Sequence, residues 1–287
     1  MNRRRIAAAA LASLLVFATA CGDDDDDDTA AAGDTGGECD TSALPLKEDG
    51  TLTVATGEPA FLPWVADDDP ESGDGFESAL VYAVAAAMDI APEDVTWIRT
   101  GFDEAIAPGE KDFDLNVQQY SITDERAEVV DFSDGYYEVE QAIVAAADSE
   151  IASATSIGDL KGAQLGAAIG TTSLTYIEDV IEPDSEPLVF DDNAAAKAAF
   201  DAGQVDGIVF DLPTAYYITA VEITDAAIVG VLPVAGDAEE LGFLFEKGSE
   251  LVGCVNDALA TLKDDGTLES LQEEWLNQGG DIPTLAE

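Results

Sequence analysis

The sequence predicts a two-lobed α/β protein, and three observations support this class. Short apolar strands alternate with helical patterns from residue 50 onward, and the alternation starts again near residue 164. An extended apolar segment, residues 140–145, lies between the two runs. Strands that alternate with helices are typical of mostly parallel sheets covered by helices. We therefore expect two lobes, each a mostly parallel sheet flanked by helices, joined by a two-strand hinge.

The first run reads strand, helix, strand, helix, strand. The expected elements are, in order, residues 52–56, 76–87, 95–98, 102–106 and 113–117. The longer helix has apolar residues at helical spacing, namely Phe76, Leu80, Val84 and Ala87. The shorter helix stops before Pro108, because proline disfavours helical backbone in the residue before it.

The second run repeats the pattern. Its expected strands are residues 164–169, 187–190, 207–210 and 227–231. Three helices are expected here. The first begins at Gly170-Thr171-Thr172-Ser173, where hydroxyl groups suit a cap, and the second covers 192–202. The third begins at Asp211-Leu212-Pro213, with proline in its first turn. The tail adds a strand at 241–245 and helices at 250–262 and 267–276.

The lobe boundaries depend on where the chain crosses between the two runs. Residues 140–145 and 229–234 are the candidate crossing strands. Two crossings return the tail to the first lobe. We therefore assign residues 49–141 and 235–287 to lobe 1, and residues 142–234 to lobe 2.

Residues 1–20 have the features of a secretory signal peptide. Three arginines precede an apolar stretch at 6–17, and Ala18-Thr19-Ala20 then leads to Cys21. We expect Cys21 to be lipidated and residues 21–48 to form an acidic disordered tether, because an acidic run and small residues cannot build a core. Plain cleavage after Ala20, with a freely secreted product, is the alternative. The expected location is outside the cell, anchored to the outer face of the cytoplasmic membrane.

The charge is strongly acidic, with 61 acidic residues against 11 basic ones and a net charge of −50. Such a surface is a poor partner for nucleic acid. Adaptation to high salt is a second interpretation of the acidity, because salt screens self-repulsion. The chain has no histidine, which excludes histidine acid–base chemistry and histidine metal sites. We expect no metal and no cofactor.

Three cysteines are present, and Cys21 is assigned to the lipid. In an oxidising compartment the remaining two, Cys39 and Cys254, suggest a disulfide. It would tie the start of the folded domain to a C-terminal helix. Two unpaired thiols are the alternative.

Arg126 is the first candidate for binding chemistry. Only Arg99 and Arg126 remain after the signal peptide, and Ser121 stands five residues before Arg126. A guanidinium group binds a carboxylate through two parallel hydrogen bonds. From the residues alone, a surface ion pair is the competing interpretation.

Several motifs occur in a characteristic order along the chain. They are Phe61-Leu62-Pro63-Trp64, Gly75-Phe76-Glu77, Ser121-Ile122-Thr123-x-x-Arg126, Val130-Asp131-Phe132-Ser133-Asp134, Asp159-Leu160-Lys161-Gly162, Gly170-Thr171-Thr172, Val205-Asp206-Gly207-Ile208-Val209-x-Asp211 and Asp264-Asp265-Gly266-Thr267-Leu268. In this order the chain resembles solute-binding protein family 3, the periplasmic amino-acid-binding proteins of ABC importers, from about Leu52 to Trp275. The resemblance implies the periplasmic-binding-protein fold, an amino-acid ligand, an ABC transporter permease as partner, and a monomer.

The resemblance also implies roles for individual residues. Arg126 should clamp the α-carboxylate of the ligand, assisted by Ser121 and, from the second lobe, by Thr172 beside Thr171. Asp211 should accept the α-ammonium group. The backbone carbonyl of Gln119 should also accept from the ammonium group. The remaining implied pocket residues are Glu58, Phe61, Trp64, Phe102 and Gln118. The aromatic residues could instead belong to the core, and Asp211 and Thr172 could only cap helices.

The substrate is expected to be a polar or basic L-amino acid. Glu58 would favour a cationic side chain, whereas Gln118 and Gln119, which replace a small pair common in the family, could bind an amide such as that of glutamine. A sensor module for a receptor uses the same lobes and is the main alternative function. A dehydratase-like enzyme on this fold is the other, and we expect no catalysis because no Ser–His or Cys–His pair can form.

Overall fold

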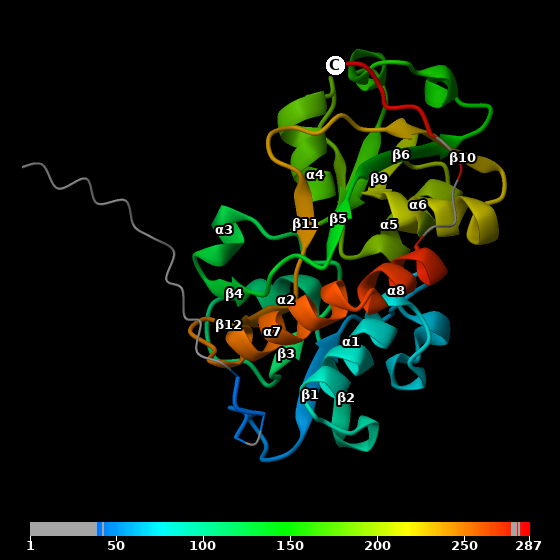
Figure 1. The fold of residues 1–287 in the computed structure, drawn as a ribbon. Coiled ribbons are helices and arrows are strands. Elements are labelled where there is room, and N and C mark those ends of the chain that lie inside the picture. The colour runs from blue at the N-terminus through cyan, green and yellow to red at the C-terminus, as the bar shows by residue number, and fades with distance from the viewer. Residues whose placement is uncertain (1–38, 42, 277–279, 281) are drawn as a thin grey trace, which may run out of the picture. The chain divides into compact units, whose positions relative to one another are not determined.

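The structure, a computed structural model, describes residues 39–41, 43–276, 280 and 282–287. The expected signal peptide, Cys21 and most of the acidic tether lie outside the described residues. The described chain forms two five-stranded sheets and one two-stranded ladder, with helices packed against the sheets (Figure 1). The predicted two-lobed α/β class is therefore confirmed.

The first sheet has the strand order β2-β1-β3-β12-β4. Its strands are β1 (Leu52–Thr56), β2 (Val95–Arg99), β3 (Leu115–Asn116), β4 (Val130–Phe132) and β12 (Leu244–Glu246). Strand β1 runs parallel to β2 and β3, whereas β12, which returns from the C-terminal part of the chain, is antiparallel to β3 and β4. The helices of this lobe are α1 (Phe76–Ala87), α2 (Phe102–Ile106), α3 (Asp124–Ala127), α7 (Leu251–Asp264) and α8 (Thr267–Trp275).

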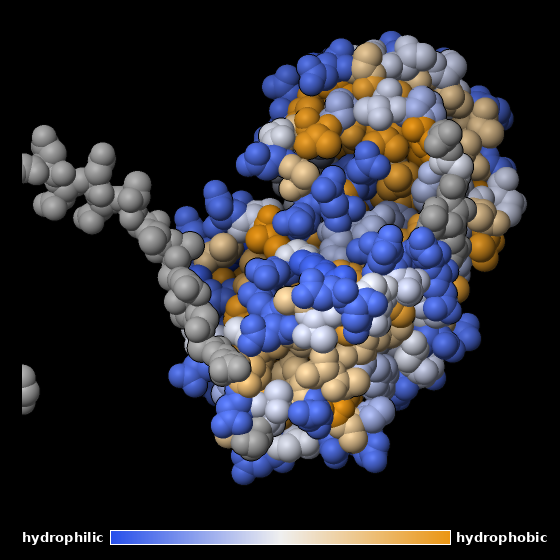
Figure 2. Space-filling model, in the orientation of Figure 1, coloured by the Kyte–Doolittle hydropathy of each residue, from blue (hydrophilic) through white to orange (hydrophobic). Residues whose placement is uncertain are grey.

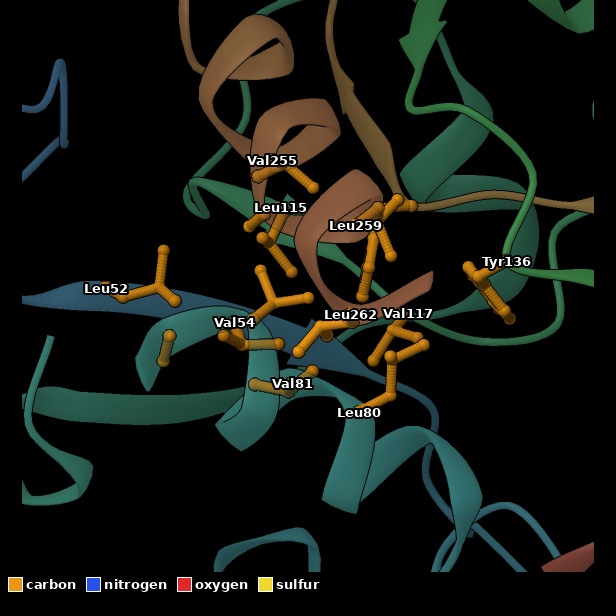
Figure 3. Close-up of a cluster of buried hydrophobic side chains, with 14 of the residues drawn as sticks. Leu52, Val54, Leu80, Val81, Leu115, Val117, Tyr136, Val255, Leu259 and Leu262 are labelled. Carbon is orange, nitrogen blue, oxygen red and sulfur yellow. The ribbon is translucent and has the colours of Figure 1, made fainter. Parts of the chain in front are cut away.

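One hydrophobic core joins this sheet to its helices. Leu52 and Val54 on β1 belong to one cluster with Leu80 of α1 and Leu259 of α7, and all four side chains are fully buried (Figure 3). Strand β1 is buried along its whole length, as expected for a central strand covered on both faces. Burial of each such side chain contributes about 1.5–3 kcal/mol. The core therefore fixes the carboxyl end of β1, where the functional residues begin.

The second sheet has the strand order β10-β6-β9-β7-β8. Its strands are β6 (Gln141–Ala146), β7 (Leu165–Ala168), β8 (Leu188–Phe190), β9 (Gly207–Asp211) and β10 (Ala226–Val231). Parallel pairs join β7 to β8 and β9, while β6 is antiparallel to β9 and β10. The α-helices here are α4 (Thr172–Tyr176), α5 (Asn193–Asp201) and α6 (Leu212–Tyr217). Separate apolar clusters cover the two faces of the sheet.

Short helical turns complete the described secondary structure. The 3₁₀ turns are Ala66–Asp68, Pro70–Ser72, Pro92–Asp94, Glu150–Ser153 and Ile157–Leu160, and the π-helical turns are Ile177–Ile181 and Ile218–Glu222. No helix among the described residues is long and apolar enough to cross a bilayer.

The crossing strands differ from those expected. The two-stranded ladder pairs β5 (Tyr137–Val139) with β11 (Glu239–Leu241), antiparallel. The expected crossing segments, 140–145 and 229–234, instead place their strands β6 and β10 side by side in the second sheet. The single strand expected at 241–245 is divided between β11 and β12. Apolar runs show that a segment is a strand but do not identify its partner, which explains this error.

The C-terminal residues also differ from the expected assignment. Lobe 1 was expected to include residue 287, but Thr284 bridges Val231 and Ala286 bridges Ser156 in the second lobe. Leu285 is buried in a core cluster of that lobe. The tail therefore covers the outer edge of β10, an edge that would otherwise expose unpaired backbone groups.

The disordered tether expected at residues 21–48 ends earlier than predicted, because Cys39, Thr41 and Lys47 contact the first lobe. The expected disulfide between Cys39 and Cys254 is present, and it joins this segment to α7. Asp114 accepts hydrogen bonds from the backbone N–H groups of Lys47 and Thr53, both at 2.7 Å. Hydrophilic side chains gather across the middle and along the rim of the face shown in Figure 2, and apolar residues lie exposed between them.

Candidate functional site

A cavity of about 170 Å³ lies where the carboxyl ends of strands from the two sheets meet. Open α/β sheets commonly bind ligands at such strand ends. The structure places ten of the eleven predicted ligand-binding residues on the cavity wall. They are Glu58, Phe61, Phe102, Gln118, Gln119, Ser121, Arg126, Thr171, Thr172 and Asp211. The exception is Trp64.

Arg126 is held rigidly across the cleft. Its Nη1 donates to the carbonyl of Ser121 at 2.7 Å, and its Nη2 donates to the carbonyl of Gly170, in the other lobe, at 2.9 Å. The guanidinium group lies over the ring of Phe102, 5.4 Å from its centroid, which favours the cation. Gly170 has φ +70°, and a Cβ there would overlap Asp103, so the close approach of the lobes at this point requires glycine.

The charge of Arg126 has no direct acidic partner. Among the described residues, no carboxylate lies within salt-bridge distance of it. Arg126 is 8% exposed, and burial lowers the pKa of its guanidinium group from the ordinary value. A buried cation without a counterion is costly, and an anion in the cavity would offset that cost.

Asp211 supplies a negative charge from the second lobe. It ends β9 and precedes α6, but its side chain forms no cap hydrogen bond with that helix. Instead its Oδ1 accepts from Nε2 of Gln141 at 2.8 Å. Burial, and next the negative charge of Glu239, raise the pKa of Asp211 to about 7. A cationic group in the cavity would favour the ionised carboxylate.

The fully buried carboxylate of Glu77, at the start of α1, positions one wall of the cavity. It accepts hydrogen bonds from the Tyr136 hydroxyl at 2.6 Å, from the Gln119 backbone N–H at 2.8 Å, and from the Gln119 side-chain amide. Gln119 has φ +50°, an uncommon conformation for a residue other than glycine. Burial raises the pKa of Glu77 to about 7. Because Glu77 binds the amide of Gln119, that side chain is not free for a ligand, whereas the amide of Gln118 remains at the wall.

The hydroxyl groups of Ser121 and Thr172 are directed toward a residue that the sequence analysis missed. Both hydroxyl groups donate to Oε1 of Glu239, and the oxygen of Thr172 lies 2.6 Å from it. The two hydroxyl oxygens are 3.4 Å apart. Glu239 lies at the start of β11, between the lobes in the chain, and not in any recognised motif. Thr171 caps α4, accepting from the N–H of Leu174 at 3.2 Å. The expected hydroxyl donors to the ligand are therefore engaged within the protein.

The aromatic residues separate into two groups. Phe102 stacks on Tyr120 with ring centroids 4.7 Å apart, and Phe61 is half-buried at the cavity. Trp64 is 2% exposed and does not line the cavity; its Nε1 donates to Oγ1 of Thr214, in α6, at 2.8 Å. Trp64 thus packs in the core, where its ring makes edge-type contacts with Phe76 and Tyr137, and its hydrogen bond to Thr214 joins the lobes.

Additional acidic side chains face the cavity. Glu58 lies there as expected, and Asp191 and Asp192, which the sequence analysis missed, line it from the start of α5. Asp192 also accepts from the N–H of Ala195 at 2.7 Å, as an N-cap. Arg126 is the one cation among the described lining residues. No group of three potential metal-binding side chains occurs in the described part of the chain.

The chain is similar to known proteins over most of its length. The sequence profile of the bacterial extracellular solute-binding proteins, family 3, matches residues 52–278. The L-cystine-binding protein TcyJ of Escherichia coli (strain K12) is 28% identical over 240 residues, covering 83% of this chain and 86% of that protein.

Two solved structures are similar over most of the chain. An ancestral arginine-binding protein bound to glutamine has a TM-score of 0.67 at 33% identity, covering 79% of this chain and 97% of the other. An ancestral amino acid-binding protein, described as a precursor of cyclohexadienyl dehydratase, has a TM-score of 0.66 at 31% identity, covering 79% and 96%.

Proposed function

Because this chain belongs to family 3 of the bacterial extracellular solute-binding proteins, we propose that it is the substrate-binding component of an amino-acid ABC importer. In this proposal an L-amino acid binds between the two lobes and the lobes close around it. The observation that carries the proposal is the placement of Arg126 and Asp211, from opposite lobes, on the wall of one cavity.

A zwitterion matches these two charges. Its α-carboxylate takes the cavity side of the Arg126 guanidinium group, and its α-ammonium group takes Asp211. A buried charge needs a partner to offset its desolvation, and charge-assisted hydrogen bonds contribute about 1.5–3 kcal/mol each. A ligand that contacts both lobes binds the closed state more tightly than the open one, so it shifts the population toward closure.

The side chain of the amino acid is proposed to be cationic. Once Arg126 and Asp211 are matched by the zwitterion, Glu58, Asp191 and Asp192 remain as negative groups at the cavity. Their field favours arginine or lysine and disfavours glutamate. The amide of Gln118, whose Oε1 accepts from the Tyr120 hydroxyl at 3.0 Å and whose Nε2 could bind an amide oxygen, supports glutamine as the second candidate. One similar structure, an ancestral arginine-binding protein, is bound to glutamine.

Calorimetric titration of residues 39–287 with each of the twenty amino acids tests this function. We expect the tightest binding for L-arginine or L-lysine, weaker binding for L-glutamine, and none for agmatine, which lacks the α-carboxylate. Binding of agmatine as tightly as arginine would remove the assigned role of Arg126. Absence of binding for every amino acid would contradict the function itself.

We also propose that the mature protein is a monomer attached to the outer face of the cytoplasmic membrane through a lipid on Cys21. The support is the sequence around Cys21, which lies outside the described residues. Mass spectrometry of the membrane fraction should show an N-terminal lipidated cysteine. A Cys21→Ala variant should appear in the soluble extracytoplasmic fraction, and its retention on the membrane would argue against the lipid anchor.

Binding without turnover is the final part of the proposal. The similarity to a precursor of cyclohexadienyl dehydratase makes dehydration the reaction to exclude. The chain has no histidine. The carboxylate of Asp211 accepts from Gln141, and that of Glu77 accepts from Gln119 and Tyr136. We expect no product from prephenate under conditions in which arginine binds. Measurable turnover would assign an enzyme instead.

A further inference from the structure

The carboxylate of Glu239 lies immediately behind the cavity wall. Thr172 and Ser121, which do line the cavity, both donate their hydroxyl hydrogens to Oε1 of Glu239. Each hydroxyl has only one hydrogen to donate. Oε1 of Glu239 therefore accepts one hydrogen bond from a side chain of each lobe, and neither hydroxyl hydrogen is left for a ligand.

Ser121 and Glu239 belong to the same side of this contact. Ser121 forms a backbone bridge with Leu241, the last residue of β11. On either side of it, the N–H of Ile122 donates to the carbonyl of Glu240 at 2.8 Å, and the N–H of Gly242 donates to the carbonyl of Tyr120 at 2.9 Å. The loop that carries Ser121 is thus fastened to the strand that carries Glu239.

Thr172 comes from the other side. It is the first residue of α4, which follows β7 of the second sheet. Its hydroxyl donates to Glu239 at 2.6 Å. Among the described strands, β11 pairs with β5 and does not belong to the second sheet. The hydrogen bond from Thr172 to Glu239 is therefore made between the lobes, whereas the bond from Ser121 is made within one of them.

Gln141 extends this contact to the opposite end of the site. Its Nε2 lies 3.3 Å from both carboxylate oxygens of Glu239 and donates to Asp211 at 2.8 Å, while its Oε1 accepts from the Ser173 hydroxyl at 2.6 Å. The side chain is 5% exposed. One buried amide thus connects Glu239 with the residue assigned to the ammonium group.

We propose that Glu239 is a positioning residue that latches the lobes in the closed state, through the Thr172 hydroxyl, without touching the ligand. This inference rests on the proposed function, because it presumes that the lobes open and close around an amino acid. A charge-assisted hydrogen bond made only after closure slows opening. Glu239 therefore sets the lifetime of the complex, whereas Arg126 and Asp211 select the ligand.

The test compares Glu239→Ala with Glu138→Ala. Glu138 is exposed on β5, the partner strand of β11, so both variants remove one negative charge from the same ladder. At pH 8, where Asp211 is already about nine-tenths ionised, and with L-arginine as the probe, we expect Glu239→Ala to raise koff about tenfold, a change of about 1.4 kcal/mol, with kon within about twofold. Distances between spin labels on the two lobes should show a larger open population in the ligand-free Glu239→Ala protein only.

A double-mutant cycle separates a latch from a general loss of structure. Thr172→Val keeps the shape of the side chain and deletes the hydroxyl donor. In the Thr172→Val background, Glu239→Ala should raise koff by about threefold rather than tenfold, because only the longer bonds from Gln141 remain to be lost between the lobes. Additive effects of the two substitutions, unchanged koff in Glu239→Ala, or tighter binding would overturn the proposal. If Glu239→Ala does not fold, Glu239→Gln, which weakens the acceptor, must raise koff in the same direction by about threefold.

The latch and the proposed function fail in different ways. If the wild-type chain binds no amino acid, the function is wrong, but the distances in the ligand-free variants still report on the latch. If arginine binds and the distances and koff of Glu239→Ala equal those of Glu138→Ala, the function stands and the latch is wrong.

Discussion

Lowering the pH should weaken amino-acid binding through Asp211. The pKa of this carboxyl group in the ligand-free site is raised to about 7, first by burial and then by Glu239. Glu77 raises it further and Arg126 lowers it. Only the ionised form of Asp211 can pair with the ligand's ammonium group. Binding therefore selects the deprotonated site and releases a proton when the pH is below about 7.

The magnitude follows from the fraction of ionised Asp211. At pH 8 this fraction is about nine-tenths, and at pH 5 it is about one-hundredth, so Kd should rise roughly 100-fold between them. Below pH 7 the slope is about tenfold per pH unit. Isothermal titration calorimetry with L-arginine at pH 5, 6, 7 and 8 measures this, and two buffers of different ionisation enthalpy report the released proton.

Two variants assign the effect to its source. Asp211→Asn should bind weakly and with nearly the same Kd at every pH, because no carboxyl group remains to titrate there. Glu77→Gln, which changes the other carboxyl group with a pKa raised to about 7, should keep the slope. A Kd for the wild-type chain that is constant from pH 5 to pH 8 would refute the reasoning.

Four further outcomes are expected. Arg126→Lys should weaken arginine binding about tenfold and Arg126→Ala more than about 100-fold, measured by calorimetry, because lysine keeps the charge and loses the planar fork. Replacing Cys39 and Cys254 by alanine should lower the free energy of unfolding by roughly 2–5 kcal/mol in urea titrations, because the disulfide closes a loop of 215 residues; an unchanged value would remove its structural role. Trp64→Phe should cost about 1 kcal/mol by leaving the Thr214 hydroxyl without its indole partner, and no loss would mean that solvent replaces this bond. The net charge of −50 predicts a larger free energy of unfolding in about 2 M KCl than in 0.1 M, and salt-independent stability would end the high-salt interpretation.

The pKa shifts also predict how the stability of the ligand-free protein depends on pH. Glu77 and Asp211 bind protons more tightly when folded than when unfolded, because their pKa values are raised from 4.5 and 3.8 to about 7. Their contribution to stability is complete below pH 4 and is lost as the pH rises to about 7. The urea midpoint of Glu77→Gln should therefore depend less on pH over this range than that of the wild type, and equal dependence would contradict the assigned shift.

The local structure could largely be predicted from the sequence. The helix at 76–87 was placed correctly because apolar residues recur at helical spacing, and the strand at 52–56 because its residues are β-favouring and bounded by Gly57. Most predicted site residues line one cavity because motif order reports which strand ends carry polar residues. These features depend on residues close together in the chain.

The errors concern contacts between distant residues. The ladder of β5 with β11 depends on pairing across about 100 residues, which no periodicity shows. The family resemblance implied a pocket role for Trp64, but a large aromatic side chain suits a core equally well. Glu239 carried no signal among 61 acidic residues. Its role depends on the ladder of β5 with β11, which places its carboxylate beside Ser121 and Thr172.

A crystal structure of the chain grown with L-arginine tests the central claim most directly. The account predicts the α-carboxylate at about 2.7–3.2 Å from the guanidinium nitrogens of Arg126, and the α-ammonium group at the same distance from the Asp211 carboxylate. An arginine bound elsewhere, or bound in this cleft with its side-chain guanidinium group on Asp211 and its α-carboxylate away from Arg126, would contradict it.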